Sequence, residues 1–335
     1  MIKRRVGLGV TLVLLMLWSL GILLYQGDLP AAVVDAKYTS PSSQFLTLAD
    51  GARIHFRDEG HPTGLPIVLV HGSMASLHTW APWVERLGET YRIVTLDLPA
   101  HGLTGAVPSG DYSSAAQLQV VQAITSHLNL NAFVLGGNSM GGGVSWRYAL
   151  EHPESVLALI LVNATGPAAW SQARRDATPE QASPLVFKLL RQSWFRAIAS
   201  RIDPYYLAVQ GAKSAYNDSP VVTDALIMRY YELALRAGTR DAILGRVNSW
   251  RGSANPAEDL SVLTQPTLIL WGREDSVIPV ATANQFQANI LHSKLVIYDN
   301  VGHAPMEEVP DRTAQDVRQF LKTLKTNAQQ DALIQ

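Results

Sequence analysis

Residues 137–141 have the sequence Gly-Asn-Ser-Met-Gly, which is the G-x-S-x-G spacing of a nucleophile elbow. The apolar run Phe133 to Leu135 precedes it and a helix-compatible stretch from Gly142 to Glu151 follows, so the chain would turn from strand to helix within about four residues. Such a turn leaves little room for side chains beside its apex, and the two glycines of the motif meet this need. The hydroxyl of Ser139 would stand at a helix N-terminus, where backbone N–H groups favour developing negative charge. This pattern predicts nucleophilic attack by Ser139.

A serine hydroxyl needs a base within hydrogen-bond reach and a third group that orients the base. Three fixed positions match by chance in roughly one chain in ten of this length, so the assignment depends on these partners. With the chain order serine, acid, histidine, the acid is Asp275, with Glu274 as the alternative, and the base is His303. Each follows an apolar run, Thr267 to Trp271 for the acid and Lys294 to Tyr298 for the base. The carboxyl ends of such strands are where open α/β sheets place their sites.

Residues 70–74, Val-His-Gly-Ser-Met, follow another apolar run and are expected to supply part of an oxyanion hole. Gly72 would let this loop approach closely, and the backbone N–H of Ser73 could point to the same position as that of Met140. Loss of one such donor costs about 3 kcal/mol of transition-state stabilisation. We interpret His71 as a hydrogen-bonding support of this loop rather than as a base.

These residues must be positioned by strands, and short runs rich in Val, Ile and Leu recur along the chain. Asp50-Gly51 separates the first two runs and is a hairpin signal, which predicts an antiparallel pair at the start. The later runs are continuous, as in strands buried on both faces, and helix-like stretches separate them. We therefore predict an α/β fold with an eight-stranded, mostly parallel sheet and helices on both faces. The expected strands are 45–48, 53–57, 67–70, 92–96, 133–135, 157–162, 267–271 and 294–298.

About a hundred residues between Asn163 and Thr267 lack a convincing strand and carry many aromatic residues. Segments such as Pro184 to Ser200 and Val221 to Ala237 have the pattern of amphipathic helices. We expect an inserted helical cap over the carboxyl edge of the sheet, with an apolar pocket beneath it. The predicted division is a core at 45–166 and 257–325, a cap at 167–256, and a tail at 326–335.

Three basic residues at positions 3–5 precede the apolar run Val6 to Tyr25, which as a helix would be about 30 Å long, the thickness of a bilayer core. Asp28 and Asp35 follow it. This charge pattern predicts a transmembrane anchor over residues 1–30, a linker over 31–44, a cytoplasmic N-terminus and an extracytoplasmic catalytic domain. A cleaved signal peptide, giving a secreted protein, and a buried helix are the alternatives.

Composition excludes several classes of function. The 335 residues are 47% hydrophobic and 16% charged, with a net charge of -1, so nothing indicates a nucleic-acid partner. The absence of cysteine excludes disulfides, a cysteine nucleophile and thiolate metal sites. We expect no metal or organic cofactor, because neither a His-x-x-x-His cluster nor a nucleotide-binding glycine loop occurs in a suitable context.

Five motifs occur in the order and at the spacings of the α/β-hydrolase superfamily, over about residues 45 to 322. They are His71-Gly72, residues 97–102, the elbow from Gly137 through Gly141 to Gly142, residues 271–275, and Gly302-His303. The elbow resembles that of bacterial lipases and esterases of the monoacylglycerol-lipase kind, some of them membrane-associated. It is also similar, more weakly, to carbon–carbon bond hydrolases that act on ring-cleavage products of aromatic compounds, which typically have a glycine-rich oxyanion loop that this chain lacks.

The resemblance implies a serine hydrolase that cleaves carboxylic esters through an acyl-enzyme. Aromatic cap residues favour an apolar acyl group, and an anchor would give access to lipid-derived esters. Carbon–carbon bond hydrolysis, amide or peptide hydrolysis, and a non-catalytic ligand-binding role are the alternatives. For an amidase, Glu232 and Asp241 are candidates to hold a substrate amine. The sequence leaves the physiological substrate, acyl chain length and oligomeric state open.

Overall fold

The computed structural model describes residues 15–16, 19, 21–170, 189, 192–246 and 258–334, with side chains up to residue 324. Its centre is an eight-stranded sheet in the order β1-β2-β4-β3-β5-β6-β7-β8, in which only the pairs β1–β2 and β2–β4 are antiparallel. This confirms the predicted fold class. The strands are β1 Ser43–Thr47, β2 Arg53–Gly60, β3 Pro66–Val70, β4 Arg92–Leu96, β5 Phe133–Asn138, β6 Val156–Val162, β7 Thr267–Gly272 and β8 Ser293–Tyr298.

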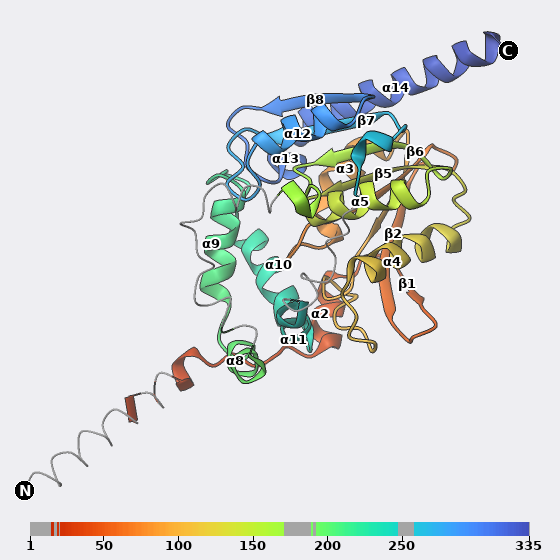
Figure 1. Cartoon of the computed structure of the whole chain (residues 1–335). Helices are drawn as coiled ribbons and strands as arrows, with labels where there is room; N and C mark the ends of the chain where they lie inside the picture. Colours follow the sequence, from red (N-terminus) through yellow and green to blue (C-terminus); the bar gives the residue numbers. More distant parts are fainter. Residues whose placement is uncertain are drawn as a thin grey trace, which may run out of the picture.

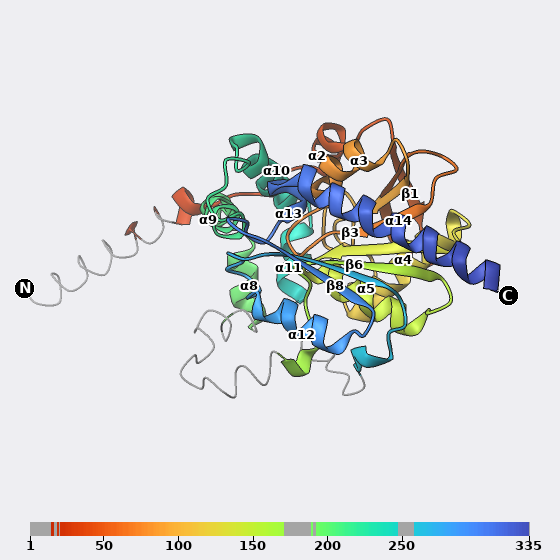
Figure 2. The same ribbon diagram turned by 90° about the horizontal axis from the view of Figure 1, so that it is seen from above.

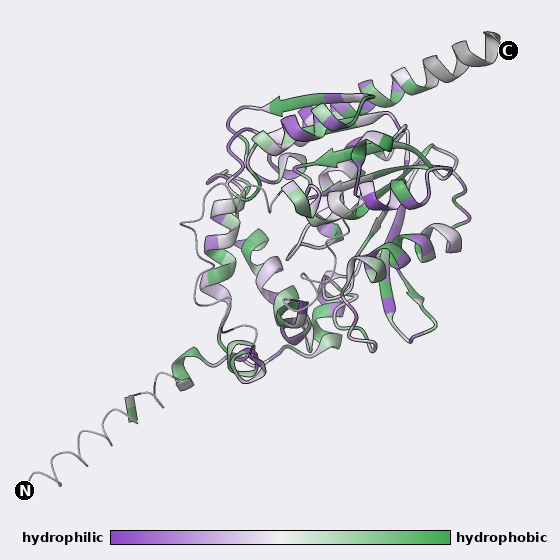
Figure 3. Ribbon diagram, in the orientation of Figure 1, coloured by the Kyte–Doolittle hydropathy of each residue, from purple (hydrophilic) through white to green (hydrophobic). Residues whose placement is uncertain are grey.

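Helices cover both faces of this sheet (Figures 1 and 2). On one face, α4, α5 and α12 bury one hydrophobic cluster, and on the other, α3 and α14 bury a second. The interior strands consist mostly of buried apolar residues because both of their faces are covered, and Figure 3 shows much hydrophobic colouring in the sheet. The bounds are α3 Ala81–Leu87, α4 Ser114–His127, α5 Met140–Glu151, α12 Ala281–Asn289, α13 Pro305–Glu308 and α14 Pro310–Ile334, with short 3-10 helices η1 Leu77–Trp80 and η3 Leu260–Val262.

Between β6 and β7, the described residues include the helices α8 Ser193–Ala199, α9 Tyr205–Ala215, α10 Asp224–Leu235 and α11 Thr239–Gly245. They lie beside the carboxyl edge of the sheet in Figure 1. The expected helix at 221–237 corresponds to α10, and α8 lies within the expected helix at 184–200, of which residues 184–188 and 190–191 lie outside the described residues. The division into core and cap at residues 167 and 256 stays a prediction.

The predicted membrane anchor requires a correction. Much of the run from Val6 to Tyr25 lies outside the described residues, and the described part of the chain contains no helix with both the length and the apolar character to cross a membrane. Helical residues of this run end at Leu24, and Tyr25 instead pairs with Ile202 of the cap in a β-bridge. The anchor over 1–30, the membrane partner and the extracytoplasmic location that depended on it are therefore not supported.

Residues 24–38, which we call the N-terminal strap, run along the cap helices instead. Backbone hydrogen bonds join Leu29 to Leu235 and to Ala237, at 2.8 and 2.9 Å. The strap ends in helix α2, Ala31–Tyr38, so the predicted linker over 31–44 is partly helical and the first strand starts within it at Ser43. Val34 of α2 is buried against Leu103 and against Leu233 of the cap. Tertiary packing of this kind stabilises short helices whose sequence alone does not predict them.

Asp28 and Asp35, interpreted above as charges flanking an anchor, form ion pairs with cap arginines. Asp28 Oδ1 lies 2.6 Å from Arg240 Nη2, and Asp35 Oδ1 lies 2.7 Å from Arg236 Nε. Both arginine side chains are at most 10% exposed, so water screens these pairs less than it screens surface pairs. The two carboxylates thus fasten the strap to the cap.

Candidate active site

The backbone at residues 137–142 turns abruptly from β5 into α5. Ser139 lies at the turn with φ 53° and ψ −117°, a conformation that non-glycine residues rarely adopt. A Cβ atom on Gly141 would lie 2.1 Å from the carbonyl oxygen of Val70, so only glycine fits where the turn passes β3. The structure therefore places Ser139 at a strained apex that packing on both sides holds in place.

His303 and Asp275 are in direct contact at the same edge of the sheet. His303 Nδ1 lies 2.7 Å from Asp275 Oδ2, and the two side chains are 11% and 0% exposed. Asp275 Oδ1 accepts hydrogen bonds from the backbone N–H groups of Val277 and Ile278, at 2.7 and 2.9 Å. The alternative acid, Glu274, is directed elsewhere, because its Oε2 accepts from the N–H of Val301. Geometry therefore favours Asp275 over its neighbour.

Two further residues position this pair, and the sequence analysis did not assign them a role at the site. Asn163 follows β6 and donates from Nδ2 to Asp275 Oδ2, at 2.6 Å. Glu308 of α13 accepts from the N–H groups of Gly302 and Ala304, at 2.9 and 3.1 Å. These two hydrogen bonds fix the backbone on both sides of His303. Burial raises the pKa of Glu308. Only the sequence proximity of Glu308 to His303 could have indicated it.

The cap also contacts this loop directly. The backbone N–H of His303 donates to the carbonyl of Ala215, the last residue of α9, at 2.6 Å. Ser276, next to Asp275, donates from its hydroxyl to the carbonyl of Ser214 at 2.9 Å. The end of α9 therefore fixes the loops that carry both side chains.

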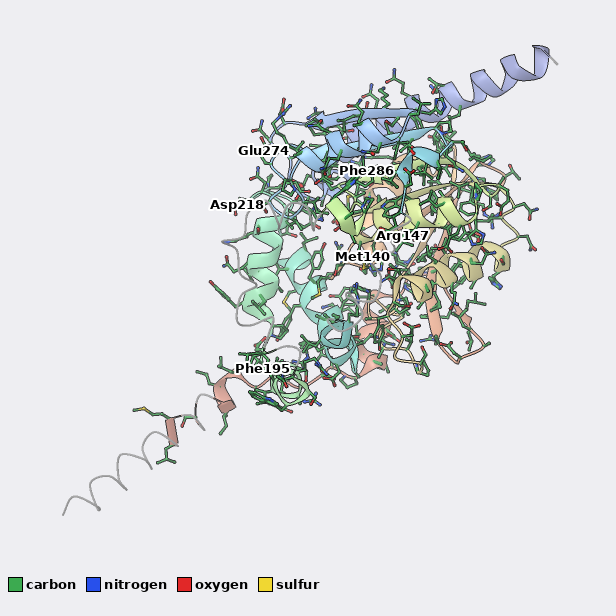
Figure 4. All side chains as sticks on the ribbon, in the orientation of Figure 1. Met140, Arg147, Phe195, Asp218, Glu274 and Phe286 are labelled. Atoms are coloured by element: carbon green, nitrogen blue, oxygen red, sulfur yellow. The ribbon has the colours of Figure 1, made fainter. Side chains whose placement is uncertain are left out.

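The loop after β3 is held by His71. Its fully buried ring donates from Nδ1 to the carbonyl of Gly72, at 2.7 Å, and accepts at Nε2 from the N–H of Leu98, at 3.0 Å. This pattern requires the neutral imidazole, and burial lowers the pKa of His71 accordingly. Met140 is the first residue of α5 (labelled in Figure 4), so its N–H has no acceptor within the helix.

His78, in η1 after this loop, is a second, partly buried imidazole. Its Nδ1 contacts the hydroxyl of Ser76 at 3.0 Å, and its Nε2 donates to the carbonyl of Tyr38 at 3.0 Å. Arg57 Nη2 lies 3.1 Å from the same Nε2. Burial lowers the pKa of His78 to about 4, and the positive charge of Arg57 adds to this effect while Asp97 opposes it. His78 is therefore neutral in the folded protein above that pH.

We expect this histidine to make the protein acid-sensitive. The unfolded chain binds a proton at His78 near pH 6.5 and the folded chain only near pH 4, so its contribution to stability is present above about pH 6.5 and is lost as the pH falls to about 4. The loss should reach about 3 kcal/mol, and His78→Gln should remove that part of the pH dependence. Urea unfolding from pH 4 to 8 measures it, with the exposed His292→Gln as the control. An unchanged acid slope in His78→Gln would contradict the assignment.

Ser139 and His303 line one cavity of about 420 Å³, within the range of small-molecule sites. The loop after β3, including Gly72 and Ser73, lines one part of it, and residues of α9 and α10 line another. Apolar side chains and glycines make up most of the wall, among them Pro204, Leu207, Ala208, Gly211, Ala212, Ala234, Val277 and Met306. Among the residues that the structure describes, no group of three or more His, Asp or Glu is arranged to hold a metal ion.

A family model described as the alpha/beta hydrolase fold matches residues 66–310. The chain therefore belongs to the α/β hydrolase fold family and is a hydrolase. This confirms the resemblance inferred from the five motifs.

Relatives of both expected kinds are found. Lipase 1 of Psychrobacter immobilis is 27% identical over 288 residues, which cover 84% of each chain. The 2-hydroxymuconate semialdehyde hydrolase of Pseudomonas sp. is 24% identical over 297 residues, covering 86% of this chain and 97% of that one. Among solved structures, a membrane phospholipase A described as a novel bacterial virulence factor is 26% identical, with a TM-score of 0.68, and the match covers 96% of this chain and 99% of that chain.

Proposed function

We propose that this hydrolase cleaves carboxylic esters with an apolar acyl group through an acyl-enzyme on Ser139. The observation that carries the proposal is the His303–Asp275 pair, at 2.7 Å, beside a strained serine that lines the same largely apolar cavity. A nucleophile, a base and an orienting acid in this chain order are the requirements for acyl transfer. The names of the lipase and phospholipase relatives support an ester substrate.

In the proposed mechanism, His303 Nε2 takes the hydroxyl proton while Ser139 Oγ attacks the ester carbonyl carbon. The oxyanion that forms accepts hydrogen bonds from the N–H groups of Ser73 and Met140. The bond to the alcohol oxygen then breaks, and the departing alcohol takes the proton from His303. Water then gives a proton to the same imidazole and attacks the acyl carbon. The bond from this carbon to Ser139 Oγ breaks, the imidazolium returns the proton to Oγ, and the acid leaves. Asp275 holds the Nδ1–H tautomer and stabilises the imidazolium.

Carbon–carbon bond hydrolysis is the second candidate, because the 2-hydroxymuconate semialdehyde hydrolase is also a relative. Amide hydrolysis has less support. The carboxylate of Glu232, a candidate to hold a substrate amine, instead accepts from Lys37 and Tyr38 of the strap, and Asp241 is exposed.

The test is a panel of p-nitrophenyl esters from acetate to palmitate, with the p-nitroanilide of the preferred acyl group and a dienone ring-cleavage product beside it. We expect the esters to be hydrolysed fastest, with a maximum at a medium or long chain because the cavity is apolar. A folded protein that cleaves the dienone and none of the esters would overturn the ester assignment in favour of the second candidate.

A further inference from the structure

Three hydroxyl groups from different elements meet in the wall of the cavity. Thr79 belongs to η1, Tyr216 follows α9, and Tyr230 belongs to α10, and all three residues line the space that contains Ser139. The two tyrosine oxygens lie 2.7 Å apart. Since most of the wall is apolar, these hydroxyls form a polar spot within it, which we call the hydroxyl cluster.

A single carboxylate, that of Glu307, accepts hydrogen bonds from two of these hydroxyls. Glu307 of α13, whose side chain is 8% exposed, accepts at Oε1 from the hydroxyls of Thr79 and Tyr216, the latter at 2.9 Å. Its Oε2 lies 3.2 Å from Nη2 of Arg229, in an ion pair. The oxygens of a carboxylate in such a pair act as hydrogen-bond acceptors. The protons of Thr79 and Tyr216 are therefore directed to Glu307.

The direction of the remaining proton follows. Tyr216 has one hydroxyl proton, and it is used on Glu307, so the 2.7 Å contact between the tyrosines must be donated by Tyr230. Burial raises the pKa of both phenols, and the negative charge of Glu307 adds to the rise, so both keep their protons. Each of the three protons is thus used inside the cluster. Toward a ligand, the hydroxyl oxygens of Thr79 and Tyr230 can therefore act only as hydrogen-bond acceptors.

We propose that the hydroxyl cluster is a substrate subsite that accepts a hydrogen bond, and that the enzyme favours esters whose acyl chain carries a hydroxyl group at the matching position. This rests on the proposed ester hydrolysis and specifies its substrate class. A ketone or carboxylate at that position would face lone pairs and lose its hydrogen bonds to water without replacement. Sites that hydrogen-bond one substrate group discriminate more strongly than apolar pockets do.

The experiment compares p-nitrophenyl esters of one acyl chain length that carry a hydroxyl or an oxo group at successive carbons of the outer half of the chain. At one position the hydroxy ester should exceed its oxo partner in kcat/KM by about fivefold to tenfold, the value of one neutral hydrogen bond. A ratio near one at every position would overturn the subsite. Hydrolysis of the unsubstituted ester, measured beside them, reports separately on the proposed function.

Variants then locate the effect. Tyr230→Phe removes an acceptor and should bring the ratio close to one. Tyr216→Phe removes the partner that takes the Tyr230 proton, so this proton becomes available to the ligand and the ratio should shift toward the oxo ester. Tyr231→Phe is the matched control, because Tyr231 lines the same cavity while its hydroxyl interacts with Asp203. If Tyr231→Phe changes the ratio and Tyr230→Phe does not, the cluster is not the subsite.

Discussion

Replacing Ser139 with alanine is expected to lower kcat for ester hydrolysis by about 10,000-fold to a millionfold. The substitution removes the oxygen that would carry the acyl group, while the cavity and the backbone donors remain, so a small residual rate over water should persist. Steady-state rates on the preferred p-nitrophenyl ester measure the loss. Covalent labelling by a fluorophosphonate should disappear in the same variant.

Ser73→Ala is the matched control for this experiment. Its side chain is exposed, and the proposed role of residue 73 uses only its backbone N–H, which alanine keeps. This variant should therefore retain most of the activity and all of the labelling. Undiminished labelling of Ser139→Ala would show that another residue is the nucleophile.

The second large effect is expected at Asp275. Asp275→Asn leaves one oxygen in place of two. That oxygen cannot accept both from Asn163 and His303, which share Oδ2, and from the N–H groups of Val277 and Ile278, which share Oδ1. The variant also lacks the negative charge that stabilises the imidazolium. An equivalent change in a serine protease triad lowers kcat by about 10,000-fold. We expect a loss of this order in kcat with little change in KM, since Asp275 does not line the cavity as described.

Glu274→Gln provides the comparison, because it removes the charge of the neighbouring acid, whose carboxylate accepts from Val301 instead of approaching His303. Its kcat should stay much closer to wild type. The opposite ranking of the two variants would make Glu274 the orienting acid.

The sheet was predictable because its strands are continuous apolar runs of the right length. The run Arg92 to Leu96 coincides with β4, and the predicted 267–271 differs from β7 by one residue. The strand-to-helix turn at Ser139 was also visible, because its steric demand falls on glycines two residues away. Strand burial and a tight turn both restrict the residue types of a few consecutive positions, so both can be recognised in a short stretch of sequence.

The supporting contacts were not predictable, because they join residues far apart in the chain. Glu307 contacts Thr79 across 228 residues, and Asn163 contacts Asp275 across 112. Neither has a characteristic spacing, and a surface glutamate before a helix would look the same in sequence. The prediction of a membrane anchor from the N-terminal run was wrong for a related reason. Hydropathy measures the preference of a residue for any apolar environment, whether a bilayer or a protein interior. It contains no information about the backbone hydrogen bonds that residues 24–29 form with the cap.

The strap has a consequence for the order in which the protein assembles. Asp28 and Asp35 find their arginine partners 212 and 201 residues later, so these contacts cannot form until synthesis has passed the cap. Contacts of such long sequence separation carry a high loop-closure cost and form late. Once formed, they tie the strap to α11 and to Arg236, which follows α10, so strap and cap should open together as one cooperative unit in hydrogen exchange. The strap, although it comes early in the sequence, is thus expected to dock onto the cap late in folding.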